Sequence, residues 1–306
     1  ARAGWAAGMA HPEPHLLRQA TLALHEAKSL GTRIVEYADD LAVRIAQRHQ
    51  TEIELRTAVV NEQFVLHGQP LFDVFESRVE AVELLLRWRH PEAGILTPDH
   101  FLPIAEKCDF VDDIDQWVVR QLVDHAVRTH PTLHFAVNLS TRSISKPSSL
   151  RYIGDLLRAS GVATGRMHVE LSHSDRPVDA AAVIESSKVL ADSGVGITID
   201  RFGDGYASLA TLMQMSATSV KLDRSLTALV DRPDGRGIVS AIMGFASERG
   251  LRLIAAGVET AEQAEVLRDM GCRYQQGNYF QAATQLENIA VLGCERSEHG
   301  RALLPS

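Results

Sequence analysis

The sequence predicts an α/β protein whose main part is a (β/α)8 barrel, a TIM-like fold. From about residue 62 to about residue 280, strand-like segments alternate with helical patterns, giving about eight strands. Strands separated by helices imply parallel pairing, and eight such units match a closed barrel. Polar residues also recur where these strands end, which is where barrel enzymes place their catalytic groups. An open doubly wound sheet is the alternative, but no glycine-rich GxGxxG turn follows an early strand.

The N-terminal part of the chain follows a different pattern. Five apolar residues share one helical face before the C-cap signal Gly31: Leu16, Leu17, Ala20, Leu24 and Ala27. "TRIVEY" reads as a short strand, and a mostly polar helix follows, as in a connector. We expect an N-terminal helix and strand fragment over residues 1–40, a linker helix over 41–58, the barrel over 59–295 and a tail over 296–306.

The barrel elements follow in order. "FVLHGQPLF" and "AVELLLRW" read as strands because they are apolar at alternate or at all positions. One helix begins at Pro98 with Thr97 as its N-cap, and a second covers "DDIDQWVVRQLVDHAV". Helices over about 147–160, 178–192, 235–249 and from Thr260 separate the remaining strands. Those strands are "HFAVNLS", "MHVELS", "GVGITID", "SVKLDR", "LRLIAAGVE" and "CRYQQG".

Composition excludes several classes of protein. The chain has 306 residues, 45% hydrophobic and 23% charged, which suits a globular protein with a full core. Its net charge of −8 and the lack of a long basic run argue against binding of a nucleic-acid duplex. Cys108, Cys272 and Cys294 are far apart without CxxC pairing, as expected in a reducing cytoplasm. No segment reads as membrane-spanning, although an anchor could lie in a longer protein, because the chain opens at Ala1 without Met.

Polar residues at equivalent strand ends form a candidate site. They are Glu83, Asn138, Glu170, Asp200, Lys221, Glu259 and Gln276. Three carboxylates and an amide meeting at one barrel mouth would suit Mg²⁺, Mn²⁺ or Ca²⁺, and Lys221 with Arg87 could bind a phosphate. Each such residue taken singly is more often a turn or cap residue, as Asp200 before Gly203 and Gly205 illustrates. Their recurrence in register with the barrel repeat favours a common site.

These motifs resemble those of the EAL domain, the barrel of cyclic-di-GMP phosphodiesterases. The matching stretches are "ELLLRWRHP", "VNLS", "VELS", "FGDGYASL", "VKLDRS", "AGVET" and "QQG", in that order. Residues 1–40 resemble the end of a GGDEF domain through "ATLALHEAKSLG". The resemblance implies a module of a GGDEF-EAL protein that signals through this bacterial second messenger.

The resemblance also implies roles for individual residues. In the family, two divalent ions hold a water that attacks one phosphodiester and gives the linear dinucleotide pGpG. The positions around the first ion match Glu83, Asn138, Glu170 and Asp200, and Lys221 matches the lysine near the attacking water. Positions that contact the nucleotide or shape its pocket match Gln69, Arg87, Asp223, Glu259 and Gln276.

Several positions depart from the family pattern. Arg201 replaces the second of two consecutive aspartates, and Ala256 replaces a glutamate that serves as general base and second-metal ligand. His173 stands where a glutamate steadies the loop after strand five, and Ala282 and Ala283 replace a basic residue and a proline. We therefore expect one divalent cation at most, a lost second metal site and very slow or absent hydrolysis.

Three functions remain open on this basis. The first is a degenerate, inactive receptor for cyclic-di-GMP in which Arg201 pairs with a phosphate. The plainer alternative for this side chain is that Arg201 pairs with Asp204 or faces solvent. The second is a weak phosphodiesterase, and the third is a nucleotide-free scaffold for protein partners. By analogy alone, a homodimer through the region near the loop after strand five is expected.

Overall fold

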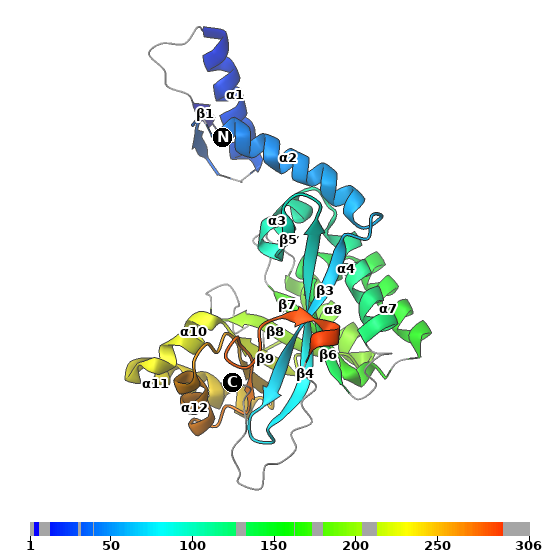
Figure 1. The fold of residues 1–306 in the computed structure, drawn as a ribbon, viewed down its shortest axis with the longest axis vertical. Coiled ribbons are helices and arrows are strands. Elements are labelled where there is room, and N and C mark those ends of the chain that lie inside the picture. The colour runs from blue at the N-terminus through cyan, green and yellow to red at the C-terminus, as the bar shows by residue number, and fades with distance from the viewer. Residues whose placement is uncertain are drawn as a thin grey trace. The chain divides into compact units, whose positions relative to one another are not determined.

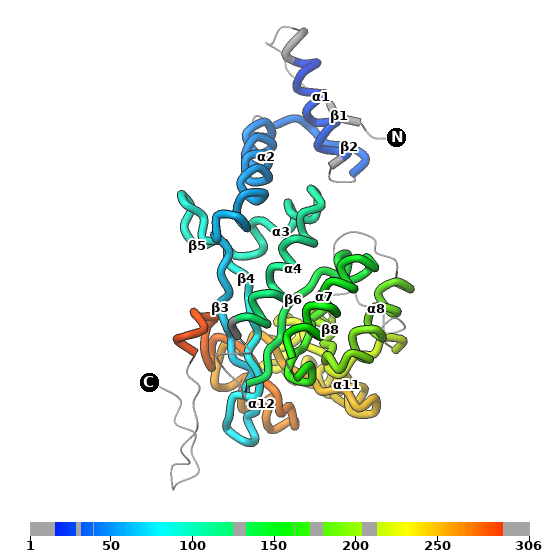
Figure 2. Tube along the Cα trace, turned by 90° about the vertical axis from the view of Figure 1, so that its right-hand side faces the viewer, coloured from blue at the N-terminus to red at the C-terminus, as the bar shows by residue number. Residues whose placement is uncertain are grey.

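The chain forms two compact units, Ala1–Glu62 with Asp99–Asp109, and Gln63–Pro98 with Phe110–Ser306. The structure is a computed structural model that describes residues 3–5, 13–29, 32–38, 40–126, 133–161, 163–172, 180–203 and 213–289. Figure 1 labels the helices and strands, and Figure 2 shows the same chain turned by 90°. In the described part of the chain, no helix combines the length and apolarity that crossing a membrane requires.

The first unit consists of a small sheet and three helices. Strands β1 (Ala3–Trp5) and β2 (Ile34–Glu36) pair in parallel. The helices are α1 (Glu13–Ser29), α2 (Leu41–Ala58) and α3 (Pro98–Lys107). A helix, a strand and a second helix follow one another up to residue 58, as expected. The helix from Pro98, expected as part of the barrel, belongs to this unit from Asp99 on. A two-bond ion pair joins α2 to α1, because Arg48 donates to both carboxylate oxygens of Glu26 at 2.9 and 2.6 Å.

The second unit contains the predicted barrel. In the described residues, eight strands close into a ring in the order β3-β4-β6-β7-β8-β9-β10-β11, and β3 pairs with both β4 and β11. The strands are β3 (Phe64–Asp73), β4 (Arg78–His90), β6 (His134–Ser140), β7 (Met167–Ser172), β8 (Gly196–Phe202), β9 (Ser219–Leu222), β10 (Arg252–Ala255) and β11 (Tyr274–Gln275). Short strands β5 (Gly94–Leu96) and β12 (Thr284–Gln285) add to β4 and β3.

Helices cover the outside of the barrel strands, as Figures 1 and 2 show. They are α4 (Val111–Gln121) with its π-helical extension η1 (Leu122–Ala126), α6 (Thr141–Ile144), α7 (Pro147–Ser160), α8 (Ala180–Asp192), α10 (Arg224–Ala228), α11 (Pro233–Glu248) and α12 (Ala261–Asp269). Three 3-10 turns complete the described chain: η2 (Thr164–Arg166), η3 (Leu229–Asp231) and η4 (Leu286–Asn288). Thr260 caps α12 by accepting a hydrogen bond from the amide of Gln263, so this helix begins where the sequence predicts.

One strand of the barrel runs against the expected direction. The alternation of strands and helices predicts parallel pairing throughout, but β3 is antiparallel to β4 and to β11. The reason is local, because only residues 74–77 join β3 to β4, and parallel neighbours need a crossover of a dozen residues or more. The barrel is therefore closed as predicted, with one antiparallel strand.

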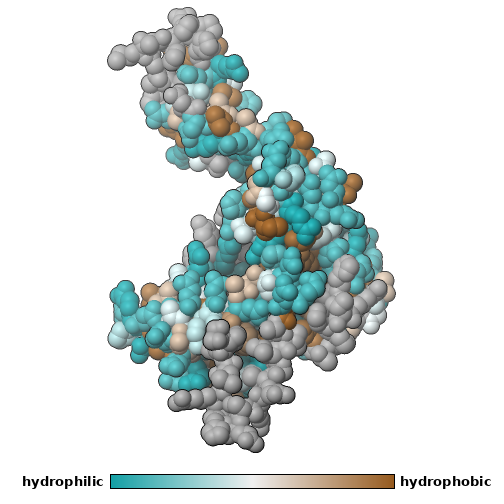
Figure 3. All heavy atoms as spheres, viewed as in Figure 1, coloured by the Kyte–Doolittle hydropathy of each residue, from teal (hydrophilic) through white to brown (hydrophobic). Residues whose placement is uncertain are grey.

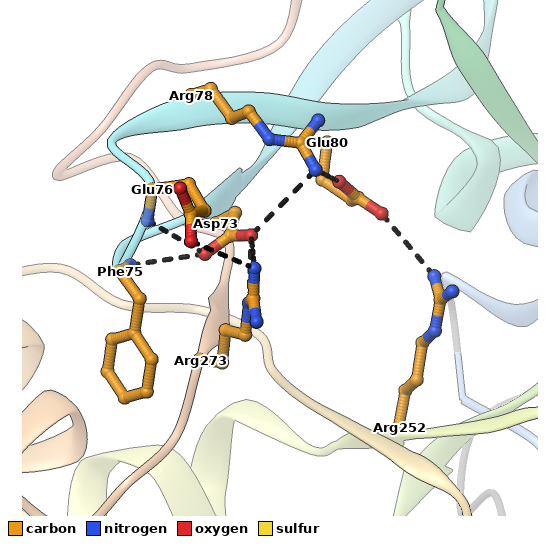
Figure 4. Close-up of polar contacts among 7 residues, drawn as sticks. All are labelled: Asp73, Phe75, Glu76, Arg78, Glu80, Arg252 and Arg273. Atoms are coloured by element: carbon orange, nitrogen blue, oxygen red, sulfur yellow. Dashed lines mark hydrogen bonds and ion pairs between the residues drawn. The ribbon is translucent and has the colours of Figure 1, made fainter.

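A buried carboxylate holds the turn between β3 and β4. The carboxylate of Asp73 is fully buried and accepts hydrogen bonds from the amides of Phe75 and Glu76, both at 3.1 Å. Arg273, just before β11, donates to its other oxygen at 2.8 and 2.6 Å (Figure 4). Burial alone would raise the pKa of Asp73, but the bonds from Arg273 and the two amides hold this pKa below its usual value. Asp73 thus connects the β3–β4 turn to the start of β11, the other neighbour of β3.

Replacing this carboxylate is expected to destabilise the barrel. Asp73→Ala should lower the free energy of unfolding by about 2–3 kcal/mol at pH 7, because it removes bonds to a charged acceptor. The folded pKa lies below the unfolded one, so the stabilisation is present above about pH 4 and disappears as the pH falls through the folded pKa. Urea unfolding at several pH values measures the difference.

The matched control is Asp269→Ala, whose side chain is 76% exposed at the end of α12. It should change the free energy of unfolding by less than about 0.5 kcal/mol at every pH. An Asp73→Ala effect as small as that of the control, or one that grows on acidification, would contradict this role.

Candidate functional site

The predicted site residues come from neighbouring strands of the barrel. Asn138 on β6 lies opposite Glu170 on β7, and Gln69 on β3 lies opposite Glu83 on β4. Because the parallel strands run in the same direction around the ring, inward side chains at similar heights on them converge. Lys221 on β9 joins them from the far side of the ring.

Lys221 lies at the centre of this group. Its ammonium donates to Glu83 Oε2 at 2.6 Å and to Glu170 Oε2 at 2.7 Å, and all three side chains are at most 9% exposed. Asn138 donates to the other oxygen of Glu83 at 2.7 Å, and Gln276 donates to Glu83 Oε2 at 2.9 Å. The structure thus brings five predicted residues into one hydrogen-bonded network, which we call the Lys221 cluster.

The cluster and the neighbouring Asp200 contain more carboxyl groups than cations. Burial opposes ionisation of Glu83. The charge of Lys221 and the hydrogen bonds that Glu83 accepts nevertheless hold the pKa of Glu83 below its usual value. The pKa of Glu170 is raised well above the usual value by burial and by the charge of Glu83. The pKa of Asp200 is raised by burial, against the attraction of Lys221. Burial opposes the charge of Lys221, yet the carboxylates raise its pKa. One ammonium therefore faces three carboxyl groups.

Gln69 and Arg87 extend the same face of the β3–β4 pair. The side-chain amide of Gln69 donates to the carbonyl of Gln281 at 3.2 Å, and its backbone carbonyl accepts from Gln276 at 3.4 Å. Arg87 lies four residues beyond Glu83, so alternation places it on the same side of β4. Its guanidinium donates to the carbonyl of Leu86 at 2.7 Å. Gln69 therefore borders the Lys221 cluster, and Arg87 lies farther along the same face of β4.

Arg201 adopts an unusual backbone conformation at the end of β8. Its φ of 52° lies in the left-handed region, which is uncommon for residues other than glycine, asparagine and aspartate. The register with β9 shifts between Ile199 and Phe202, so Arg201 falls in a bulge. Its side chain is 58% exposed, and Nε lies 4.0 Å from Asp200 Oδ2. The guanidinium is therefore presented at the surface next to Asp200. Asp204, the alternative partner, lies outside the described residues.

Asp223, Ala256 and Glu259 follow the next two strands. Asp223 caps α10 by accepting from the amide of Ser225 at 2.9 Å. Burial opposes ionisation of Asp223, but its bonds to Ser225 and the charges of two nearby arginines lower its pKa. Ala256 directly follows β10. Glu259 is exposed, and its amide donates to Gln263 at 2.9 Å. Asp223 and Glu259 thus shape the rim rather than join the Lys221 cluster.

The turn after Gln276 allows a close approach of two backbones. A Cβ on Gly277 would lie 2.0 Å from the carbonyl oxygen of Val258, so only glycine fits there. The amide of Val258 in turn donates to the carbonyl of Gln276 at 3.0 Å. This contact explains the glycine in "QQG" and positions Gln276 toward Glu83.

Two residues that support the site were not predicted from the sequence. Asp115 on α4 is 4% exposed and accepts from the amide of Ser140, at the end of β6, at 3.0 Å. Gln263 on α12 is 6% exposed and links Glu259 to Asp231. Asp115 could have been predicted as a buried supporting residue, because it is a carboxylate on the apolar helix face that Ile114, Val118 and Val119 form. His173 lies outside the described residues.

The donor chemistry fits one divalent cation. Glu83, Asn138, Glu170 and Asp200 supply carboxylate and amide oxygens, which Mg²⁺, Mn²⁺ and Ca²⁺ prefer. With all three carboxyl groups ionised, their charge would exceed that of the one ammonium, and a doubly charged ion would balance the difference. The described residues contain no ready-made group of three or more acidic, His or Cys ligands, because Lys221 lies between Glu83 and Glu170. A cation here would have to draw these carboxylates away from Lys221.

Comparisons with known proteins identify relatives of this chain. A model of the EAL domain matches residues 52–283. The cyclic di-GMP phosphodiesterase NbdA of Pseudomonas aeruginosa is 34% identical over 273 residues, which is 87% of this chain and 35% of NbdA. The bifunctional diguanylate cyclase/cyclic di-GMP phosphodiesterase MucR of the same species is 33% identical, over 86% of this chain and 39% of MucR. The chain therefore spans well under half the length of these relatives.

Solved structures share the fold. The phosphodiesterase PaMucR in its c-di-GMP complex superposes with a TM-score of 0.71 at 34% identity, covering 78% of this chain and 98% of that one. The EAL enzyme Bd1971 in its cGMP-bound form gives a TM-score of 0.73 at 26% identity, covering 81% and 70%.

Proposed function

Because the chain belongs to the EAL-domain family of cyclic-di-GMP phosphodiesterases, we propose that it is a receptor that binds cyclic-di-GMP without hydrolysing it at a useful rate. The observation that carries this proposal is Arg201, an exposed cation at the barrel mouth directly after Asp200. Relatives of this chain are named as phosphodiesterases of this dinucleotide, which supports the choice of ligand.

We expect loss of hydrolysis because of two positions at the ends of β8 and β10, the strands on either side of β9. Arg201 after Asp200 on β8 and Ala256 after β10 replace carboxylates that the family pattern has there. Two unit charges about 4 Å apart interact by roughly 4 kcal/mol at an effective dielectric near 20, so a second divalent ion beside Arg201 would face about twice that repulsion. Ala256 offers neither a ligand nor a base. Proton removal from an attacking water therefore lacks the base that the family pattern has at this position.

Ligand binding relies on cations that this chain already has. Arg201 and Arg87 are suited to phosphate oxygens because a guanidinium donates two parallel hydrogen bonds. Lys221 already offsets part of the carboxylate charge under the mouth, which lowers the repulsion that a dianionic ligand would meet. Binding without metal is therefore expected, with Gln69, Asp223, Glu259 and Gln276 shaping the pocket around the dinucleotide.

One divalent cation remains compatible with the site. We propose that Glu83, Asn138, Glu170 and Asp200 would hold it, and that when bound it would neutralise phosphate charge. A weak phosphodiesterase is the second candidate function, favoured by these retained donors. It predicts linear pGpG in Mg²⁺ or Mn²⁺ that Glu83→Ala abolishes.

Calorimetric titration of cyclic-di-GMP into the chain in EDTA tests the role of Arg201. Arg201→Ala should weaken binding at least tenfold, since hydrogen bonds to charged groups are worth about 1.5–3 kcal/mol. Arg268→Ala is the matched control, because its side chain is similarly exposed (54%) but lies near the end of α12. Equal affinity of all three proteins would contradict a phosphate contact by Arg201, and no heat from any of them would favour the scaffold function.

A further inference from the structure

The motif "VKLDRS" contains an arginine to which the strand-end pattern gives no role. Arg224 directly follows Asp223, begins α10 and is exposed. In the part of the chain that the structure describes, no hydrogen bond or ion pair holds its guanidinium. This cation is therefore available to a ligand that arrives from solvent.

The stem of Arg224 lies against the end of β10. A Cβ on Gly257 would lie 2.5 Å from the Cβ of Arg224, 3.2 Å from its Cα and 3.9 Å from its Cγ. Gly257 also has a φ of 72°, so glycine is required there on both counts. Because Gly257 directly follows Ala256, Arg224 begins beside the position where the family pattern has its general base and second-metal ligand.

Arg201 reaches the same part of the rim from β8. The amide of Asp223 donates to the carbonyl of Phe202 at 3.1 Å, and Arg201 and Arg224 are the outer neighbours of these two residues in sequence. Burial would raise the pKa of Asp223, but its bonds to Ser225 and the charges of Arg201 and Arg224 lower it. The two arginines thus lie on either side of Asp223, whose carboxylate is already bonded to the amide of Ser225.

The surroundings of Arg224 suit a charged ligand. In Figure 3, mainly hydrophilic residues cover the region of α10 and α11, with few strongly hydrophobic ones in this view. Two guanidiniums near each other repel, and an anion that contacts both replaces this repulsion by attraction. A phosphate group has enough oxygens to accept hydrogen bonds from two guanidiniums at once.

We propose that Arg224 is a second phosphate-binding residue, and that Arg201 and Arg224 together hold one phosphate of cyclic-di-GMP beside Ala256. The two guanidiniums then supply the positive charge that a second divalent ion supplies in the family. This inference rests on the proposed function and adds to it the residue that completes the phosphate site.

Calorimetric titration of cyclic-di-GMP in EDTA tests the new residue. Arg224→Ala should weaken binding at least tenfold, because it removes hydrogen bonds to a charged group. Arg224→Lys should recover only part of the loss, because an ammonium lacks the planar fork of a guanidinium. Arg158→Ala is the matched control and should stay within twofold of the wild type. Its side chain is 67% exposed in the last turn of α7, which leads to the start of β7 and so away from the mouth.

A variant that lacks both arginines tests whether they share one phosphate. Its loss of affinity should differ by more than about twofold from the product of the two single losses, as for residues with a common partner. Equality with that product would overturn the shared phosphate. Circular dichroism of each variant establishes that the barrel remains folded.

The same titrations separate this inference from the function on which it rests. A wild-type chain that does not bind the dinucleotide would overturn both. Binding by the wild type that Arg224→Ala leaves within twofold would overturn the role of Arg224 alone. Equal weakening by Arg224→Ala and Arg158→Ala would overturn it too, because any lost positive charge would then have the same effect.

Discussion

Restoring two carboxylates, by Arg201→Asp together with Ala256→Glu, is expected to raise hydrolysis of cyclic-di-GMP in Mg²⁺ or Mn²⁺ by about 10²–10⁴-fold, the usual contribution of a positioned general base. Arg201→Asp removes the charge that repels a second ion, and Ala256→Glu supplies a base at the end of β10. The backbone should tolerate the first change, because aspartate adopts the left-handed conformation at φ 52° more readily than arginine. Chromatographic separation of the linear dinucleotide measures the rate.

The single variants and a triple variant serve as controls for this experiment. Each single change leaves one of the two defects in place, so neither should recover more than a small part of the gain. Adding Glu83→Ala to the double variant should return the rate to background, because it removes a ligand of the first ion. A wild-type rate equal to that of the double variant would show that positions 201 and 256 do not limit the chemistry. A double variant that binds the dinucleotide but gains no activity would show the same.

Lys221→Met is expected to lower the free energy of unfolding in EDTA by about 3–5 kcal/mol, the usual cost of removing one partner from a buried ion pair. Lys221 is 4% exposed and bonds both Glu83 and Glu170, and its loss removes the cation that both carboxyl groups contact. Divalent ions should recover part of the loss, because an ion bound only by the folded chain stabilises it. Urea unfolding with and without Mn²⁺ measures both effects.

The matched control is Lys188→Met on α8, where the side chain is 52% exposed and forms an ion pair with Glu185 on the same helix. It should change the free energy of unfolding by less than about 0.5 kcal/mol, with or without Mn²⁺. A Lys221→Met effect below about 1 kcal/mol would contradict the central position of this ammonium among the carboxylates.

Most elements of this fold could be predicted from the sequence because their signals are local. The spacing of apolar residues and the capping signals predicted the helices that begin near Pro98, Pro147 and Thr260, and the strands that follow them. The antiparallel β3 was missed, although the four residues before Arg78 are too few for a crossover. A count of alternating strands and helices gives the number of strands but does not test each connection.

The membership of the candidate site could be predicted, but its arrangement could not. The strand-end rule identified Glu83, Glu170 and Lys221. Lys221, however, bonds Glu83 across 138 positions of sequence and Glu170 across 51. Such bonds depend on strand order and stagger, which no local pattern contains. The same holds for the bulge that turns Arg201 outward.

The most direct test of the claim that this chain binds cyclic-di-GMP without hydrolysing it is a titration of the dinucleotide into the wild-type chain in EDTA. Mn²⁺ is then added, and the recovered dinucleotide is analysed. The predicted result is saturable binding in EDTA, with the dinucleotide recovered in its cyclic form after long incubation with the metal. Binding that appears only with Mn²⁺, or conversion of the ligand to linear pGpG, would contradict a metal-independent receptor.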